Sequence, residues 1–212
     1  MDTKANTKAI SEIAASQMGL ITSAQAARFG VSRNVLAYMA RVGKVERVEH
    51  GVYRVCGAPY SVNQDIYAVW LSSAPAQMAH ERYSDFDGTV VGGRSAAAIH
   101  GIGDFFISPY RFFTHTRLNS KRKNIIFTKR LVDKADVVFT DFGLPLTSIT
   151  RTIYDLIYDN EELSLFSGAF TDALKDKSFD ADRLRVLFME QLASKRCIYE
   201  QYFDEMMNIV NG

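Results

Sequence analysis

A cluster of arginine and asparagine side chains between residues 33 and 54 has the chemistry of a nucleic-acid contact. Arg33 and Asn34 are adjacent, and Arg41, Arg47 and Arg54 follow within the next twenty or so positions. A guanidinium can donate two hydrogen bonds to guanine, and a carboxamide can make two hydrogen bonds to adenine. The other arginines of the cluster could pair with the phosphates of the DNA backbone. These residue types predict a DNA-binding surface if local structure presents them together.

The residues before this cluster have the pattern of two helices. Apolar side chains recur at helical spacing and predict a first helix, which Gly19 closes: Ala9, Ile10, Ile13, Ala14 and Met18. Thr22 is a good N-cap for a second helix over residues 23–29. Gly30 allows the positive φ that a tight turn needs.

A third helix carries the chemistry. Ser32 is its expected N-cap, and the helix should run to about Val42, where Gly43 ends it. One face is apolar and should pack on the first two helices: Val35, Leu36, Met39 and Val42. The other face holds Arg33, Asn34, Ala37, Tyr38 and Arg41. Two short helices joined by a glycine-containing turn are typical of helix-turn-helix proteins, whose second helix enters the major groove.

Two short strands should follow the third helix. Their apolar residues alternate with charged ones, and the turn between them is Glu49-His50-Gly51, with Gly51 at positive φ. Three helices followed by a hairpin make a winged helix, and Arg47 and Arg54 would lie on the wing within reach of phosphate. The expected DNA-binding residues share this helix and wing: Ser32, Arg33, Asn34, Tyr38, Arg41, Arg47 and Arg54.

The charge distribution agrees with a basic N-terminal part. The net charge is +1 overall, but it is +4 over residues 1–60 and −4 over residues 161–212. This drift suggests different partners for the two ends. Two other interpretations stay open: winged helices also serve as protein-interaction modules, and the polar face of the third helix would look the same if it were simply solvated.

The N-terminal motif resembles a known family. The stretch "ITSAQAARFGVSRNVLAYMARVGKVERVEHGVYRV" is similar to the N-terminal domain of the AbiEi antitoxins of type IV (abortive infection) toxin–antitoxin systems. The residues that match the family pattern are Gly30, Val31, Ser32, Arg33, Leu36, Gly43, Glu46, Arg47, Val48, Gly51, Val52 and Tyr53. Two later stretches, "GGRSAAAIHGIGD" and "GLPLTSITRTIYDLI", also resemble family motifs. Residues 73–91 depart from the pattern because they form a longer connection than the family suggests.

The resemblance implies a protein with two functions. A winged helix over residues 1–58 would bind inverted repeats in its own promoter as an autorepressor. An antitoxin domain over residues 59–212 would counteract a nucleotidyltransferase-like toxin in phage defence, without requiring a stable complex with it. The oligomeric state on DNA is open, with a monomer among the alternatives.

The C-terminal part reads as a mixed α/β domain. Residues 63–72 should form a helix with Trp70 in the core, and residues 94–99 a short buried helix. Four strand-like runs follow between residues 111 and 148, and four helices complete the chain. The segment "RLNSKRKN" between the first two strands reads as a basic hairpin loop, interpreted either as a solvated turn or as a second nucleic-acid contact. The expected fold class is therefore α+β: a winged helix-turn-helix, then a mixed α/β domain ending in helices.

Motifs for catalysis are not evident in the sequence. The four histidines lack metal-ligand spacing, and His100 is expected to be a hydrogen-bonded core residue. The Gly-Gly-Arg-Ser stretch at residues 92–95 has no paired acidic residues after it for two-metal chemistry. We therefore expect a non-enzyme without metal or cofactor. The competing hypotheses are a winged helix joined to a nuclease-like domain and a protein–protein adaptor.

The compartment follows from weaker signals. The two cysteines, Cys56 and Cys197, do not form a disulfide framework, and no apolar run approaches the roughly 18 residues of a membrane span. We expect a soluble cytoplasmic protein without a membrane partner.

Overall fold

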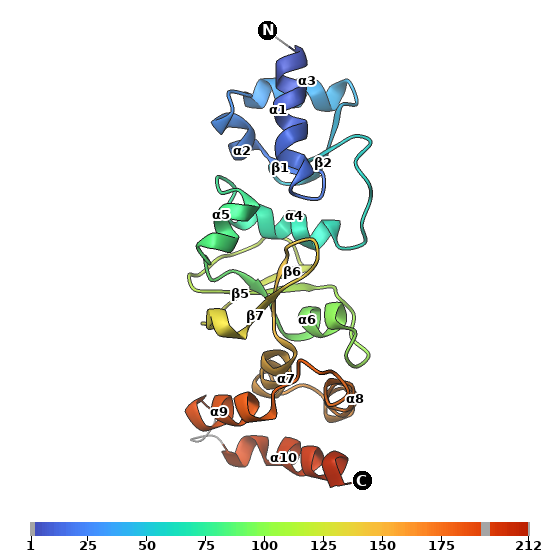
Figure 1. Cartoon of the computed structure of the whole chain (residues 1–212), viewed down its shortest axis with the longest axis vertical. Helices are drawn as coiled ribbons and strands as arrows, with labels where there is room; N and C mark the ends of the chain where they lie inside the picture. Colours follow the sequence, from blue (N-terminus) through green and yellow to red (C-terminus); the bar gives the residue numbers. More distant parts are fainter. Residues whose placement is uncertain (1–2, 192–195, 212) are drawn as a thin grey trace. The chain divides into compact units, whose positions relative to one another are not determined.

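The structure is a computed structural model that describes residues 3–191 and 196–211 (Figure 1). Contacts between Cα atoms divide the chain into two compact units. The first comprises residues 1–87 and 141–144, and the second comprises residues 88–140 and 145–212. Cys197 lies in the last helix, but its side chain is outside the described residues.

The first unit contains the expected three helices and wing. Its elements up to residue 55 are α1 (Thr3–Ala15), β1 (Leu20–Thr22), α2 (Ser23–Arg28), α3 (Arg33–Arg41), β2 (Val45–Glu49) and β3 (Val52–Val55). The sequence predicted two strands here, and the structure has three. Residues 20–22 form β1, which pairs antiparallel with β3 and makes β3 the middle strand. The strand was missed because only three residues separate the turn at Gly19 from α2.

Apolar residues from every helix of the winged helix meet in one core. Its members are buried almost completely: Ile10, Ile21, Ala26, Val31, Val35, Leu36, Met39 and Val45. The prediction that Val42 belongs to this core is wrong. Val42 caps the C-terminus of α3 and is 46% exposed, since the helix ends before its side chain can turn inward.

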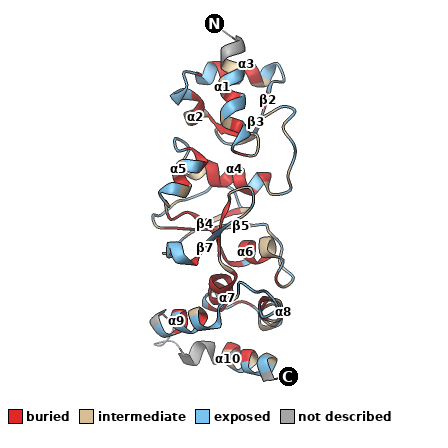
Figure 2. Ribbon diagram, in the orientation of Figure 1, coloured by how far each residue is buried: buried red, intermediate tan, exposed pale blue. Residues whose placement is uncertain are grey.

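Two further helices complete the first unit, namely α4 (Gln64–Ser73) and α5 (Ala79–Ser84). Helix α4 contacts all three strands of the winged helix, and Figure 2 shows it buried along most of its length. Trp70 is a core residue as expected, stacked on Tyr83 with ring centroids 5.7 Å apart. The guanidinium of Arg82 lies 3.9 Å from the Trp70 ring and pairs with Asp87 at 2.7 Å.

The compact unit that contains the winged helix is thus larger than residues 1–58. Helix α4 covers the sheet of the winged helix, so the backbone contacts of that fold continue to residue 87. Whether function divides near residue 58 is a separate matter and stays a prediction.

The second unit contains a five-stranded mixed sheet and five helices among its described residues. Its sheet strands, in spatial order, are β6 (Ile125–Lys129), β5 (Tyr110–Thr114), β4 (Val90–Val91), β8 (Pro145–Thr147) and β7 (Val137–Phe139). The helices are α6 (Gly93–His100), α7 (Ile149–Tyr158), α8 (Leu163–Ala173), α9 (Ala181–Gln191) and α10 (Arg196–Asn211), with a 3-10 turn at Lys134–Asp136. The expected fold class is confirmed.

The basic segment between β5 and β6 is not a hairpin loop, contrary to the prediction. The two strands pair in parallel, with Tyr110 opposite Ile125 and Thr114 opposite Lys129. The connection must therefore return along the full length of β5. Ten residues suffice, because an extended chain covers about 3.3 Å per residue and β5 has only five residues. Its basic residues Arg117, Lys121, Arg122 and Lys123 are exposed.

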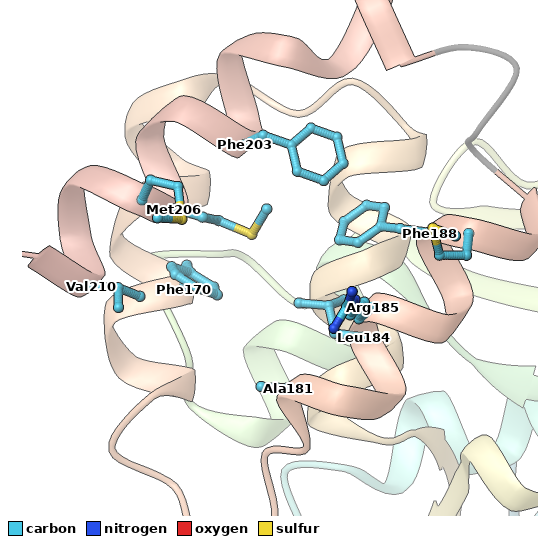
Figure 3. Close-up of a pocket in the computed structure, with 10 residues that line it drawn as sticks. Phe170, Ala181, Leu184, Arg185, Phe188, Phe203, Met206 and Val210 are labelled. Atoms are coloured by element: carbon cyan, nitrogen blue, oxygen red, sulfur yellow. The ribbon is translucent and has the colours of Figure 1, made fainter.

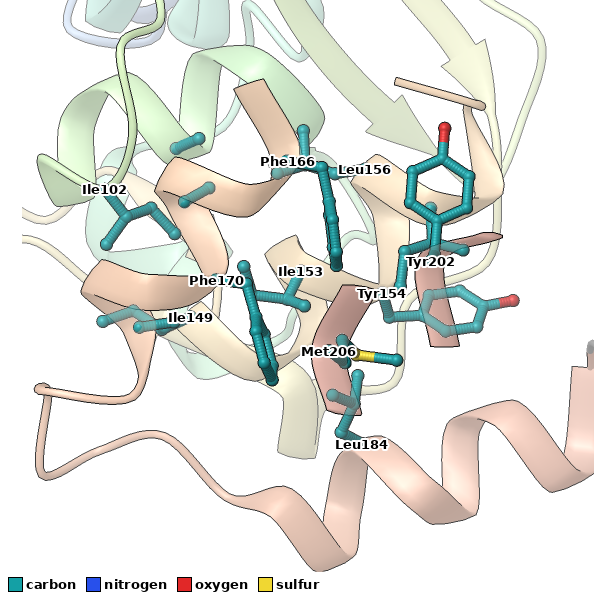
Figure 4. Packing of buried hydrophobic residues seen from close by; sticks show 14 of the residues in the cluster. Ile102, Ile149, Ile153, Tyr154, Leu156, Phe166, Phe170, Leu184, Tyr202 and Met206 are labelled. Carbon is teal, nitrogen blue, oxygen red and sulfur yellow. The ribbon is translucent and has the colours of Figure 1, made fainter. Parts of the chain in front are cut away.

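Helix α7 is the centre of the second unit's core. Residues 149–157 are all buried, and Figure 2 shows α7 red along nearly its whole length. Figure 4 shows Ile153 and Tyr154 of α7 packed among Phe166 and Phe170 of α8 and Tyr202 of α10. Burial of this many aromatic rings holds the C-terminal helices together.

Buried charge also holds α7 in place. Asp155 accepts hydrogen bonds from Arg151 at 3.1 Å and from Arg130 at 3.0 Å, while Arg151 also faces Asp136 at 3.7 Å. Arg183 of α9 makes a bidentate pair with Asp136, at 2.8 and 2.7 Å. The second carboxylate oxygen of Asp155 has no hydrogen-bond partner among the described residues. Burial raises the pKa of Asp155 to about 6, against the lowering by its two arginines.

Candidate nucleic-acid interface

Caps fix the start of the two helices of the helix-turn-helix. Thr22 forms a capping box with Gln25, in which Gln25 N donates to Thr22 Oγ1 at 3.0 Å and Thr22 N donates to Gln25 Oε1 at 2.9 Å. Ser32 has extended backbone geometry, and its hydroxyl accepts from Val35 N at 3.4 Å. Helix α3 therefore begins at Arg33, after a turn in which Gly30 has a φ of +79°. The capping hydroxyls satisfy backbone donors that the helix leaves unpaired.

Helix α3 presents one apolar and one polar face. Val35, Leu36 and Met39 are buried, which turns the opposite residues outward. The exposed side chains are Ser32, Arg33, Asn34, Ala37, Tyr38 and Arg41. The predicted α3 contacts thus share one exposed face, although their role in DNA binding stays a prediction.

The cations on this face are available to a ligand. Arg33 and Arg41 form no ion pair with any residue whose side chain the structure describes. The guanidinium of Arg41 lies 5.5 Å from the centroid of the Tyr38 ring, an interaction that leaves its N–H groups free to donate outward. Solvated cations with free donors are suited to base edges and phosphates.

The wing consists of β2, β3 and the turn between them. Gly51 has a φ of +72°, as expected for that turn, and its carbonyl accepts from Ser23 N at 2.8 Å. Arg47 is exposed beside the tip, where its Nε donates to Glu49 O at 3.3 Å and its Nη2 donates to His50 Nδ1 at 2.9 Å. These acceptors orient Arg47 without neutralising its charge.

Arg54 has a different setting from Arg47. It lies on the middle strand β3, opposite Leu20 on one side and Glu46 on the other. Its Nη2 pairs with Glu46 Oε2 at 2.5 Å, and its side chain is 24% exposed. A phosphate must therefore compete with Glu46 for this guanidinium.

A buried amide pair, which the sequence did not reveal, holds α2 in place. Gln17 and Gln25 exchange hydrogen bonds at 3.0 and 3.1 Å, and both also bond to backbone at the start of α5 or just before it. Gln25 Nε2 donates to Gln77 O at 2.6 Å, and Ala79 N donates to Gln17 Oε1 at 2.8 Å. Polar residues at helical spacing look solvated in sequence, so only the fold identifies this pair as buried.

Arg28, unlike Arg33 and Arg41, forms an ion pair with another described side chain. It makes a bidentate pair with Glu81 at 2.8 and 2.7 Å and donates to Ala76 O at 2.7 Å. The Arg28 guanidinium and the Met78 backbone N–H lower the pKa of Glu81 to about 2. Arg28 thus anchors α2 to α5.

The described residues offer no metal site and no membrane-spanning helix, and His100 has a structural hydrogen bond. His100 Nε2 donates to Thr147 O at 2.7 Å, so His100 is hydrogen-bonded as predicted, but it is half-buried and not part of the core. Its partial burial lowers its pKa. Over the described ranges, no group of three His, Cys, Asp or Glu residues is placed to hold a metal ion. None of the described helices has the length and apolarity to cross a membrane.

Comparison with known proteins agrees with the winged helix. Residues 8–55 match the family described as "Transcriptional regulator, AbiEi antitoxin". The crystal structure of the RV2827C protein from Mycobacterium tuberculosis is similar in fold, with a TM-score of 0.55 and 13% identity over 85% of this chain and 69% of that one. No curated protein matches in sequence. Over residues 8–55, this chain is therefore similar to the AbiEi antitoxin family of transcriptional regulators.

Proposed function

We propose that this protein is an autorepressor that binds inverted repeats in its own promoter through α3 and the wing. The observation that carries the proposal is the exposed face of α3, where Arg33 and Arg41 are free of ion pairs to described side chains in a domain of a regulator family. A helix-turn-helix of this kind places the start of its second helix nearest the base edges.

The residues have distinct proposed roles. Arg33 and Asn34, in the first turn of α3, read base edges in the major groove. Ser32, Tyr38 and Arg41 contact phosphate or sugar and fix the register. Arg47 reaches phosphate from the wing, and Arg54 does so where phosphate displaces Glu46.

DNA binding is tested with the full-length protein and the DNA upstream of its own gene. The protein should shift this DNA in a gel and leave a footprint over an inverted repeat, in excess of random competitor. Arg33→Ala should weaken the shift. Lys177→Ala, an exposed cation in the second unit, is the matched control and should not. If neither the wild-type protein nor the Lys177→Ala control bound this DNA, a protein–protein adaptor would be favoured instead.

We further propose that the chain is a type IV antitoxin against a nucleotidyltransferase-like toxin in abortive infection. Two observations support this proposal. The N-terminal residues match the AbiEi family, and two later stretches of the chain, residues 92–104 and 143–157, resemble motifs of that family. In this proposal residues 1–58 carry the DNA-binding surface and residues 59–212 the toxin-counteracting activity, which needs no enzymatic step. A nucleotidyltransferase-like reading frame next to the gene would support the pairing.

The division of labour is tested with intact chains, because α4 packs on the winged helix and a cut near residue 58 would expose that contact. The toxin is expressed from an unrelated inducible promoter, so that repression cannot protect the cells. Full-length Arg33→Ala should lose repression and still rescue growth. Loss of rescue by a variant that is folded and expressed would show that protection depends on DNA binding. Metal-dependent cleavage of DNA or RNA by the purified chain would instead favour the nuclease-like alternative.

A further inference from the structure

The second unit contains an apolar pocket that the proposed function does not use. It has a volume of about 440 Å³ and lies between α8, α9 and α10. Phe170, Leu184, Phe188 and Met206 line it and are nearly buried. Figure 3 shows the labelled side chains arranged around the opening, with Phe188 and Phe203 facing each other across one end.

The outer part of the pocket is also apolar. Met189, Met207 and Val210 line it and are exposed, with Met189 at 69%. Exposed apolar side chains that continue inward to a buried aromatic floor are unusual for a solvated surface. Methionine side chains adapt their shape to an apolar ligand.

The described lining of the pocket contains a single charged side chain. Arg185 is the one ionisable residue among the described side chains that line it, and it is exposed. It forms no ion pair with any residue whose side chain is described, whereas Arg183, two positions earlier, is paired with Asp136. An apolar cavity of a few hundred Å³ with one orienting polar group is the usual form of a small-molecule site.

We propose that this pocket binds a small anionic amphiphile, an aliphatic or aromatic carboxylate whose apolar part fills the cavity and whose carboxylate pairs with Arg185. Charge complementarity selects this ligand over a second copy of the chain. A two-fold contact through the pocket would bring two Arg185 side chains into an apolar interface, and no carboxylate among the described side chains lines the pocket to pair with them.

The test is titration calorimetry of the full-length protein with decanoate and, in parallel, with decanol, both below micellar concentration. Decanoate should bind more tightly than decanol. Arg185→Gln should weaken decanoate binding about fivefold, as expected for the loss of one exposed ion pair, and leave decanol binding unchanged. Equal binding of the two compounds, or equal effects of the variant on both, would overturn the anionic part of the proposal.

A second pair of variants tests the site itself. Ala181 lines the pocket and is exposed, so Ala181→Trp should fill the opening without disturbing the core and abolish binding. Val186 is exposed on the same helix and does not line the pocket, so Val186→Trp should bind decanoate like the wild type. Unchanged binding by Ala181→Trp, no binding by the wild type, or a concentration-dependent dimer that Ala181→Trp abolishes would each overturn the proposal.

Discussion

Replacing Arg47 with alanine should weaken binding to all DNA sequences alike. Arg47 is exposed beside the wing tip, and its hydrogen-bond partners, Glu49 O and His50 Nδ1, are neutral acceptors. Its full positive charge is therefore available to a phosphate. The carbonyl of Glu49 and the ring of His50 stay in place in the variant, so the turn should keep its shape.

The expected magnitude comes from counterion release. Each phosphate contact adds about 0.9 to the slope of log affinity against log salt concentration on duplex DNA. Arg47→Ala should lower this slope by about 0.9. Between about 50 and about 200 mM salt, the variant should therefore lose roughly 3.5-fold less affinity than the wild type. Arg54→Ala should change the slope less, because Glu46 already shares the charge of Arg54.

Fluorescence anisotropy with operator and with random duplexes over a series of salt concentrations measures both slopes. The control is Lys177→Ala, which removes an exposed cation from the second unit. An Arg47→Ala slope equal to that of the wild type would show that the wing does not touch the DNA backbone. A larger change for Arg54→Ala than for Arg47→Ala would refute the argument from the Glu46 ion pair.

Three other variants test separate parts of the account. Arg33→Ala should cost about 1–3 kcal/mol of operator binding and relax preference at one base pair; equal losses on operator and random DNA, measured by competition, would make Arg33 a phosphate contact. Gly51→Ala should destabilise the wing by about 1–2 kcal/mol, because alanine is strained at a φ of +72°; urea unfolding should show this, and an unchanged midpoint would contradict it. Asp155 holds its proton more tightly in the folded state, with a pKa of about 6 against an ordinary 3.8, so its contribution to stability is full below pH 3.8 and declines as the pH rises to about 6. Asp155→Asn should remove this decline from the pH dependence of the unfolding free energy; parallel curves for the two proteins would contradict the pKa shift.

Local signals explain why the winged helix was predictable. Thr22, Ser32 and the glycines at 30 and 51 each require a particular backbone conformation, and the structure has those conformations. The apolar spacing of Val35, Leu36 and Met39 fixes which face of α3 is buried. Cap and turn chemistry act over a few residues, so a sequence displays them directly.

The errors come from long-range packing. Strand β1 exists because Leu20 finds Arg54 of β3 as a partner, 34 residues away in sequence. The parallel pairing of β5 and β6 depends on the sheet as a whole, whereas strand-like runs with a short polar connection suggest a hairpin. The Gln17–Gln25 pair and the Arg151–Asp155 pair are polar groups whose burial only the fold reveals.

In the candidate site, the sequence predicted which arginines are exposed but not which of them form ion pairs. Arg33 and Arg47 are exposed as expected. The pairing of Arg54 with Glu46 joins neighbouring strands, so it depends on the register of the hairpin, which includes a bulge between Arg47 and Glu49. The pocket beside Arg185 was not predicted, because its walls come from three separate helices.

The most direct test of the central claim is the ratio of the wild-type protein's affinities for its own promoter and for random duplex of the same length, at one stated salt concentration. If α3 reads base edges, this ratio should be at least about a thousand. A ratio near one would mean that the exposed face of α3 binds DNA only through its charge. The absence of binding to either duplex would contradict a DNA-binding role for the winged helix altogether.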